Sequence, residues 1–247
     1  MRRPQSDALE IDGLTLAYGG TNVLEQATAR FAAEITCVVG TNGAGKSTLL
    51  RALATLIRPG AGSIRYGEVD VWGSAAALRD YRAQVGWVPQ EIDMPGSASV
   101  IQVLRYAAWL KELPRQAWPH AEERVLSITG LGELAGRPVG RLSGGQRRRV
   151  MLAAALISTP RIVLLDEPTV GLDSEHRTAL YDALRLVAQE SIVVLSTHLL
   201  EDLASIADVA IEAVGGGLRP IDAPNSDVDV ADRAAFYLRR MSSPLTS

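Results

Sequence analysis

The chain has 247 residues, of which 47% are hydrophobic and 21% are charged, and its net charge is −3. This composition is typical of a globular domain with a large core, and a slightly acidic chain argues against a nucleic-acid partner. No apolar run approaches the eighteen residues of a membrane span, and the single cysteine, Cys37, excludes an internal disulfide. We therefore expect a cytoplasmic protein.

The first ninety residues contain short apolar pieces separated by glycine, a pattern that predicts β-strands. An uninterrupted apolar run at 35–39 predicts a buried strand. The predicted strands cover residues 9–11, 14–18, 29–31, 35–39, 63–66, 69–72 and 85–89.

The segment after the run at 35–39 fits the pattern G-x-x-x-x-G-K-[ST], and a helical pattern follows it directly. A glycine-rich turn between a strand and a helix directs backbone N–H groups at a polyphosphate, and the helix N-terminus adds its positive dipole end. Lys46 is expected to reach the terminal phosphates, and the Ser47 hydroxyl to bind Mg²⁺. The predicted nucleotide loop consists of Gly40, Thr41, Asn42, Gly43, Ala44, Gly45, Lys46, Ser47 and Thr48.

The second half of the chain alternates helical and strand patterns. Residues 99–136 have helical spacing, with Pro114 and Pro119 as breaks, and a further helix starts near Arg147. We expect the charged run 147–149 to be a solvated helix face, with an interface contact of one arginine as the alternative, and His120 and His176 to face solvent. Aliphatic runs at 162–165 and 192–195, separated by a helix at 174–190, predict buried parallel strands.

Several later motifs resemble those of the ATP-binding cassette (ABC) ATPases. Leu-Ser-Gly-Gly-Gln at 142–146 resembles the family's signature motif, and the run ending in Asp166 and Glu167 resembles its Walker B strand. The further matches are Gly171-Leu-Asp173 for the D-loop, Ser196-Thr-His198 for the switch histidine, Gln90 for the Q-loop and Tyr18 for the adenine-stacking aromatic. The elements occur in family order over residues 8–215.

The resemblance implies an α/β fold. It predicts a P-loop NTPase core with a mixed, largely parallel sheet, an N-terminal antiparallel β subdomain and an inserted helical subdomain. A single ATPase domain is expected at 8–220, with the helical subdomain at about 91–141. Residues 221–247 are expected to form a short polar C-terminal tail with one amphipathic piece at 231–241, whose Arg239-Arg240 pair is a solvated helix end.

The same resemblance assigns the chemistry of ATP hydrolysis. Glu167 is the predicted general base for the attacking water, and His198 is predicted to hydrogen-bond the γ-phosphate. Asp166, Ser47 and Gln90 are the expected Mg²⁺ ligands, and the predicted catalytic groups are Glu167, His198, Lys46 and Gln90. Tyr18 is expected to stack on adenine, although a strand aromatic can also simply pack.

The signature motif precedes a helix and so forms a second anion site, separate from the nucleotide loop. The resemblance implies that two chains pair head to tail, as a homodimer or a cassette heterodimer, and that each signature closes the partner's nucleotide. The residues expected at that shared site are Ser143, Gly144, Gly145, Gln146 and Asp173.

The functional prediction is an ATP-hydrolysing subunit that energises a separately encoded membrane-spanning permease, from the inner face of the cell membrane. The segment 99–114 and the turn at 58–62 resemble cassettes of bacterial drug and antibiotic exporters, which favours export. Tyr106, Trp109 and Trp118 are consistent with permease docking and equally with packing. The alternative is a soluble ATPase of the same superfamily that serves assembly or regulation, for example of iron–sulfur centres. A kinase or GTPase is disfavoured by the signature motif.

Overall fold

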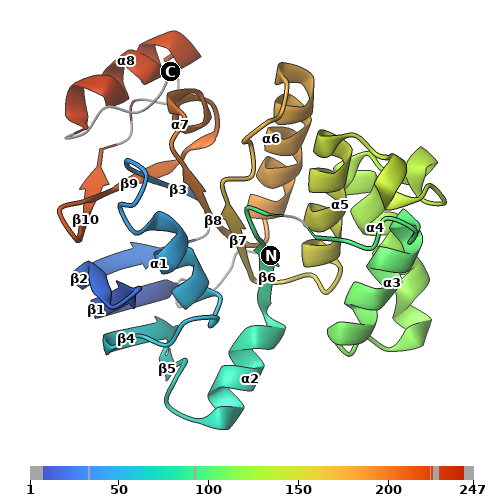
Figure 1. Ribbon diagram of the computed structural model, residues 1–247, viewed down its shortest axis with the longest axis horizontal. Coiled ribbons are helices and arrows are strands. Elements are labelled where there is room, and N and C mark those ends of the chain that lie inside the picture. Colours follow the sequence, from blue (N-terminus) through green and yellow to red (C-terminus); the bar gives the residue numbers. More distant parts are fainter. Residues whose placement is uncertain (1–7, 33, 92, 223, 225–227, 242–247) are drawn as a thin grey trace.

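The computed structural model describes residues 8–32, 34–91, 93–222, 224 and 228–241. It has two β-sheets, helices on both sides of the larger sheet, and a helical group to one side (Figure 1). The predicted fold class is confirmed. Parts of the predicted tail, residues 223, 225–227 and 242–247, lie outside the described residues.

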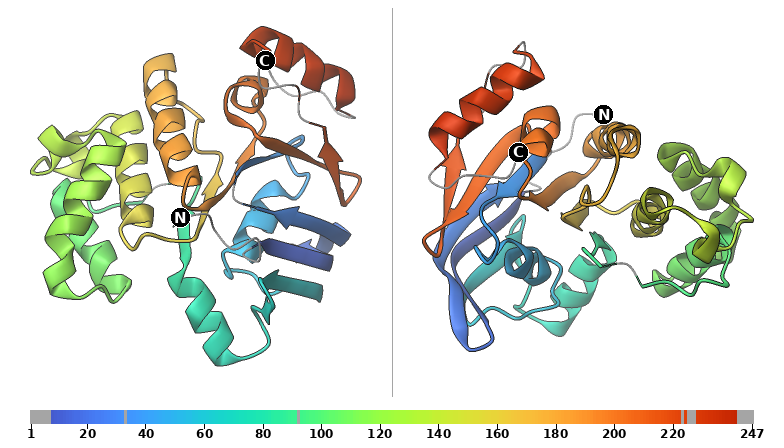
Figure 2. Two further views of the ribbon diagram at one scale, coloured as in Figure 1. Left: turned by 180° about the vertical axis from the view of Figure 1, so that it is seen from behind. Right: turned by 45° about the horizontal axis from the view of Figure 1, so that its top comes forward.

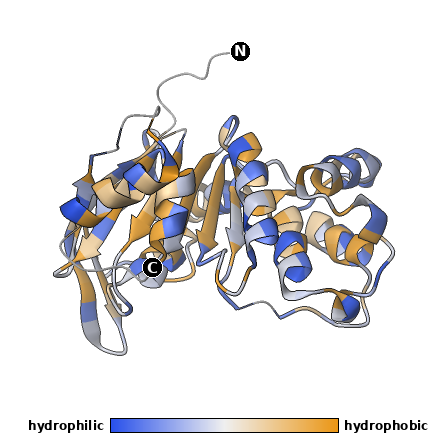
Figure 3. Cartoon of the chain, turned by 90° about the horizontal axis from the view of Figure 1, so that it is seen from above, coloured by the Kyte–Doolittle hydropathy of each residue, from blue (hydrophilic) through white to orange (hydrophobic). Residues whose placement is uncertain are grey.

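The larger sheet is mixed and mostly parallel, with the strand order β10-β9-β3-β8-β7-β6. Every residue of β3, β7 and β8 is buried, because helices or the second sheet cover both faces of these aliphatic strands. Figure 3 shows this centre as hydrophobic. The strands are β3 (Ile35–Val39), β6 (Val85–Val88), β7 (Ile162–Asp166), β8 (Ile192–Thr197), β9 (Val209–Val214) and β10 (Gly217–Ile221).

The smaller sheet is antiparallel, with the order β2-β1-β4-β5. Its strands are β1 (Leu9–Tyr18), β2 (Thr21–Phe31), β4 (Ala61–Tyr66) and β5 (Val69–Asp70). The prediction of several short pieces over residues 9–31 was wrong. Gly13, with φ of 57°, lies at a register shift inside β1 rather than between two strands, because a bulge keeps the strand continuous.

Helix α1 (Lys46–Leu53) lies between the two sheets, where Leu49, Leu50 and Leu53 are fully buried. Helices α6 (Ser174–Ala188) and α7 (Leu200–Ile206) cover the opposite face of the larger sheet. The sequence patterns did not predict α2 (Ala75–Ala83), which is largely exposed and buries only Tyr81.

The helical group lies away from the antiparallel sheet (Figure 2). It contains α3 (Val100–Leu110) and α4 (Trp118–Thr129), with 3₁₀ turns at Arg115–Ala117, Gly132–Leu134 and Val139–Arg141. Helix α5 (Gly144–Leu156) packs against α3, α4 and β6, and so joins this group to the core. Pro119 does not break α4, because it lies in the first turn, where no helical N–H bond is lost.

Within the C-terminal segment, α8 (Val230–Arg240) packs on α7 and buries Tyr237 completely. The amphipathic pattern at 231–241 is therefore confirmed as a helix with one buried side. Arg239 and Arg240 are exposed at its end, as expected, and the Arg240 guanidinium lies 3.9 Å from the Phe236 ring centroid. None of the helices within the described residues combines the length and the hydrophobicity of a membrane span.

Candidate functional site

The nucleotide loop runs from the end of β3 into α1, as the sequence predicted. Gly40, Gly43 and Gly45 have φ of 149°, 84° and 95°, which only glycine adopts without strain. A Cβ on Gly40 would lie 2.6 Å from the Ala213 carbonyl oxygen, so the neighbouring strand also requires glycine there. The loop can therefore wrap tightly at the N-terminus of α1, where helix N–H groups are available to an anion.

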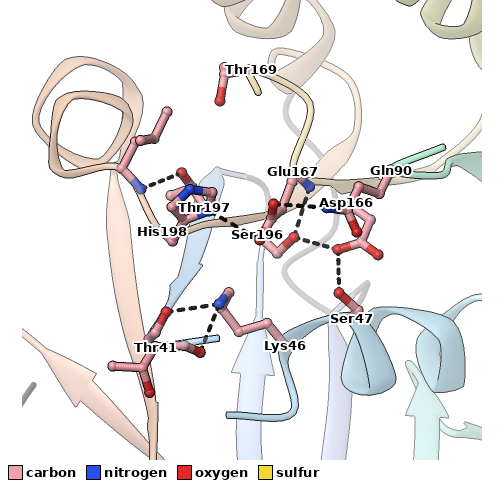
Figure 4. Close-up of polar contacts among 12 residues, drawn as sticks. Thr41, Lys46, Ser47, Gln90, Asp166, Glu167, Thr169, Ser196, Thr197 and His198 are labelled. Atoms are coloured by element: carbon pink, nitrogen blue, oxygen red, sulfur yellow. Dashed lines mark hydrogen bonds and ion pairs between the residues drawn. The ribbon is translucent and has the colours of Figure 1, made fainter. Parts of the chain in front are cut away.

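Lys46 is the first residue of α1 and is buried under the loop. Its ammonium donates hydrogen bonds to the carbonyl oxygens of Gly40, at 2.8 Å, and Thr41, at 3.1 Å (Figure 4). Burial lowers the pKa of Lys46, an effect that the nearby carboxylates of Glu167 and Asp166 partly offset. The loop thus holds a desolvated cation close to two acidic residues.

Asp166, the last residue of β7, is fully buried and has an incomplete hydrogen-bond set. Its Oδ1 accepts from the hydroxyls of Ser47, at 2.9 Å, and Ser196, at 2.7 Å. Its Oδ2 has no hydrogen-bond partner among the described residues, although it is buried. A buried carboxylate oxygen beside a serine hydroxyl fits the oxygen ligands that Mg²⁺ prefers.

Glu167 follows β7 and lies at the centre of the predicted catalytic groups (Figure 4). Its Oε2 accepts from the Gln90 amide at 3.0 Å, and its Oε1 is 3.2 Å from Nδ1 of His198. Its backbone N–H donates to the Ser196 hydroxyl at 2.9 Å. The structure therefore brings together Gln90, Glu167 and His198 from the ends of three neighbouring strands, where open α/β sheets bind ligands.

A cavity of about 570 Å³ opens between these groups and the loop. Tyr18 lies at its rim with 64% of its surface exposed, where a planar base can stack on it. Val23, Arg51 and Val170 also line the cavity, and the sequence analysis did not single them out. The remaining lining residues are Asn42, Gly43, Gly45, Lys46, Ser47, Thr48, Gln90, Glu167 and His198.

The signature residues lie at the N-terminus of α5. Ser143 is the N-cap residue, and its hydroxyl accepts from the Gln146 N–H at 3.1 Å while the Gln146 side chain accepts from the Ser143 N–H at 3.0 Å. This is a reciprocal capping box. The described lining of the cavity does not include Ser143, Gly144, Gly145 or Gln146. One chain therefore holds the two predicted phosphate sites apart.

Asp173 is likewise not among the described lining residues of the cavity. It caps the N-terminus of α6. Hydrogen bonds from the His176 backbone, at 2.9 Å, and from its ring lower the pKa of Asp173. The prediction that His176 faces solvent was wrong, because its ring packs against Gly145, where an added Cβ would lie 2.5 Å from it. His120 is exposed, as expected.

The prediction of a solvated face at 147–149 was also wrong. Arg148 is buried and donates to the carbonyl oxygens of Pro89, at 3.1 Å, and Gln90, at 2.9 Å. Burial lowers the pKa of Arg148, and Asp166 and Glu167 oppose that effect. Three consecutive residues span more than half a helix circumference at about 100° per residue, so a packed helix turns one of them inward. That geometric signal was present in the sequence.

Ser196 is a site residue that the sequence analysis quoted without a role. Its hydroxyl joins the Asp166 carboxylate to the Glu167 backbone. A hydroxyl at the end of an otherwise aliphatic buried strand needs a polar partner, and this requirement was the available signal.

The fold and the loop define a nucleotide-binding protein of the phosphate-loop class. A family model described as ABC transporter matches residues 29–170. The petrobactin import ATP-binding protein FpuD of Bacillus anthracis is 34% identical over 227 residues, covering 84% of this chain and 81% of FpuD. The daunorubicin resistance ATP-binding protein DrrA3 of Streptomyces coeruleorubidus is 37% identical, covering 81% of this chain but only 63% of DrrA3.

Solved structures agree with the sequence relatives. CbiO1 of Clostridium perfringens, part of the ABC transporter complex cbiONQ, superposes with a TM-score of 0.78 at 28% identity, covering 86% of this chain and 87% of CbiO1. This chain belongs to the ATP-binding proteins of the ABC transporter family, and it is an ATPase of that family.

Proposed function

We propose that this chain hydrolyses ATP with Mg²⁺ in a head-to-tail dimer, and that the dimer energises a separate membrane-spanning permease. One observation carries the proposal. The side chains of Gln90, Glu167 and His198 converge on a cavity floored by the nucleotide loop, while the signature residues of the same chain do not line it.

In the proposed reaction, the terminal phosphoryl group of ATP passes to water, giving ADP and phosphate. The loop N–H groups and Lys46 hold the phosphates. To do so, the Lys46 ammonium gives up its hydrogen bonds to the Gly40 and Thr41 carbonyl oxygens and binds phosphate oxygens instead. Glu167 orients the attacking water and takes its proton, a role typically worth about 10²–10⁴ in rate. His198 and Gln90 fix the Glu167 carboxylate from two sides.

Mg²⁺ fits this site, where Ser47, Asp166 and Gln90 would hold it. When bound, the cation neutralises the negative charge that develops on the phosphate oxygens. The buried, unpartnered Oδ2 of Asp166 supports the assignment, because a native structure rarely leaves such an oxygen without a ligand or partner.

The head-to-tail dimer accounts for the second anion site. Ser143 and Gly144 are exposed at the N-terminus of α5, next to the buried Gly145, and Asp173 is exposed at the N-terminus of α6. We infer that these groups complete the partner's site, since they are not among the described lining residues of their own chain's cavity.

The proposed permease contact is a groove of about 460 Å³ on the helical group. Tyr106 and Trp109 stack with ring centroids 5.9 Å apart beside it, and each is 60% exposed. Trp118 is instead partly buried and donates to the Leu113 carbonyl. The groove is lined by Asp93, Met94, Pro95, Ala98, Gln102, Val103, Tyr106, Ala107, Leu110, Met151 and Ala154.

The proposal places the protein in the cytoplasm, on the inner face of the membrane through the permease. The matched relatives include an import protein and a drug-resistance protein, at 34% and 37% identity, so export stays a prediction.

The Glu167→Gln variant tests the hydrolytic part. We expect turnover to fall by about 10² or more, while the variant binds ATP and elutes as a dimer in gel filtration with Mg²⁺-ATP. Hydrolysis at the wild-type rate would contradict the role of Glu167, and an exclusively monomeric ATP-bound form would contradict the shared site.

Affinity purification from detergent-solubilised membranes tests the transporter part. We expect a protein with several membrane spans to co-purify, and the double variant Tyr106→Ala/Trp109→Ala to lose it while keeping ATPase activity. Leu186→Ala is the matched control, because Leu186 is 53% exposed on α6, outside the groove. Recovery of cytosolic partners alone would favour the assembly ATPase.

A further inference from the structure

Asp202 on α7 is a fully buried carboxylate surrounded by hydroxyl groups. Its Oδ2 accepts from Thr169 and Thr197, each at 2.5 Å, and its Oδ1 accepts from Tyr181 at 2.6 Å. A buried carboxylate is costly unless such donors satisfy it. The three hydroxyls come from the loop after β7, the end of β8 and helix α6, so this one carboxylate joins four segments of the chain.

Two of the three hydroxyls lie beside the proposed catalytic groups. Thr169 is two residues after Glu167, and Thr197 immediately precedes His198. Figure 4 shows Thr169 and Thr197 in the same region as Glu167 and His198. Ser196, the neighbour of Thr197, binds the Glu167 backbone N–H. The result is a closed ring of contacts: Glu167 to Ser196, along β8 to Thr197, through Asp202 to Thr169, and back along the loop.

The backbone of Glu167 explains why such a ring is needed. Its φ is 47°, in the left-handed region that non-glycine residues rarely adopt. A residue in this region persists only where the surroundings determine its conformation. The Ser196 hydroxyl holds the N–H of Glu167, and the bond between Thr169 and Asp202 anchors the chain two residues later.

We propose that Asp202 is a positioning residue for ATP hydrolysis, which fixes Glu167 through Thr169 and His198 through Thr197. The proposal rests on the proposed role of Glu167 as the base. Asp202 is not among the described lining residues of the cavity, so it acts through the residues that it binds. Its effect is to keep the Glu167 carboxylate and the His198 ring, 3.2 Å apart, in one arrangement between turnovers.

The three hydrogen bonds use both oxygens of the Asp202 carboxyl group as acceptors. A carboxylate only accepts hydrogen bonds, and its two oxygens offer enough lone pairs for three hydroxyl donors. Burial and the neighbouring Asp202 raise the pKa of Tyr181, so its hydroxyl keeps the proton that it donates. The amide of an Asp202→Asn variant would instead direct a donor at one or more of these hydroxyls.

Three variants, each lacking one of the hydroxyls that donate to Asp202, distinguish a role in positioning the catalytic groups from a role in folding stability. We expect Thr169→Val and Thr197→Val each to lower kcat about tenfold to a hundredfold, with KM for ATP within about twofold of wild type. Tyr181→Phe is the matched control, because it removes a bond to the same carboxylate from α6 and should leave kcat within about twofold. Thr169→Ser keeps the hydroxyl and should recover most of the lost kcat.

Urea unfolding of all three variants provides the second readout, and we expect similar losses of stability. Losses of kcat that simply follow stability, with Tyr181→Phe as impaired as Thr169→Val, would overturn the proposal. Wild-type kcat in both threonine variants would overturn it as well. The Glu167→Gln variant distinguishes failure of this proposal from failure of the proposed function. Full turnover in Glu167→Gln contradicts the role of Glu167 as the base. If Glu167→Gln loses turnover while both threonine variants keep it, only the positioning role of Asp202 is contradicted.

Discussion

The nucleotide cradle, which is the nucleotide loop with Asp166, Glu167 and Ser196, and the signature end of α5 are both proposed anion sites at helix N-termini, but they are built in opposite ways. In the cradle, residues from α1, β7 and β8 are held by one another, as in the bonds of Asp166 to Ser47 and Ser196. At the signature, the side chains of Ser143 and Gln146 each accept from the other's backbone N–H, and Ser143 is exposed. The first site is a cavity lined by side chains from several elements, and the second is a helix N-terminus outside that cavity.

This difference indicates which site can act alone. An exposed helix N-terminus binds an anion weakly, because water competes for the same N–H groups, whereas a walled site excludes water and strengthens each interaction. We therefore expect the cradle to bind a nucleotide by itself, and the signature to contribute only when another surface encloses it. Arg148 links the two regions within one chain, since it extends from α5 to the carbonyls beside Gln90.

Mixing two inactive variants gives the largest expected effect. Lys46→Ala disables the cradle and Ser143→Arg blocks the signature, so each variant alone should lose ATPase activity. In a mixed dimer, the intact cradle of one chain meets the intact signature of the other. We expect a 1:1 mixture to regain up to about a quarter of wild-type activity, since half of randomly formed dimers are mixed and each has one complete site.

The control for that experiment is a mixture of Lys46→Ala with Lys46→Ala/Ser143→Arg, which contains no complete site in any pairing. Steady-state phosphate release is the measurement. If the Ser143→Arg variant hydrolyses ATP alone at the wild-type rate, the signature is not part of the site and the comparison fails.

Removal of the proposed Mg²⁺ from the cradle gives the next largest expected effect. In a Glu167→Gln background, which does not consume ATP, Mg²⁺-ATP at 100 times its Kd should stabilise the fold by about 2.7 kcal/mol. That corresponds to a Tm increase of roughly 5–10 °C for a domain of this size. Adding Asp166→Asn should reduce the shift to the value seen with ATP and EDTA.

Asp12→Asn serves as the matched control for the metal, because Asp12 is an exposed carboxylate on the antiparallel sheet. An Asp166→Asn protein that keeps the full Mg²⁺-dependent shift would show that the cation is held elsewhere.

The contact between the two regions can be removed with Arg148→Met. This change leaves the Pro89 and Gln90 carbonyls without their charged donor, so we expect a loss of about 1.5–3 kcal/mol in the free energy of unfolding. Arg79→Met should stay within about 0.5 kcal/mol, since Arg79 is exposed on α2. Urea titrations compare the two, and equal effects would show that the Arg148 contact does not stabilise the fold.

The two regions also differ in how well the sequence predicted them. The cradle follows from local patterns, because a phosphate loop, an aliphatic strand and a terminal carboxylate are each contiguous in sequence. The same reasoning predicted β3, β6, β7 and β8 of the larger sheet, whereas the fold class came from the family resemblance. Long strands with bulges, such as β1, were missed, because a bulge interrupts the two-residue alternation on which the prediction depends.

The contacts that lock the site could not be predicted in this way. Asp202 binds Thr169, which is 33 residues away in sequence, and Arg148 binds carbonyls 58 and 59 residues away. Backbone carbonyls carry no residue identity, so nothing in the sequence marks them as partners. His176 was misjudged for a related reason, because its partner Gly145 has no side chain that a pattern could pair with it.

The smallest expected effect comes from two similar helix caps, at which a loss of stability can be distinguished from a loss of ATPase activity. Ser99 and Ser143 both form a capping box with glutamine three residues later, in α3 and α5. Either change to alanine should cost about 1 kcal/mol in the free energy of unfolding. Only Ser143→Ala should also lower the ATPase rate, because only this hydroxyl is proposed to meet the partner's nucleotide. Denaturation and phosphate release on the same samples measure both quantities, and an equal loss of rate in Ser99→Ala would reduce the signature serine to a structural cap.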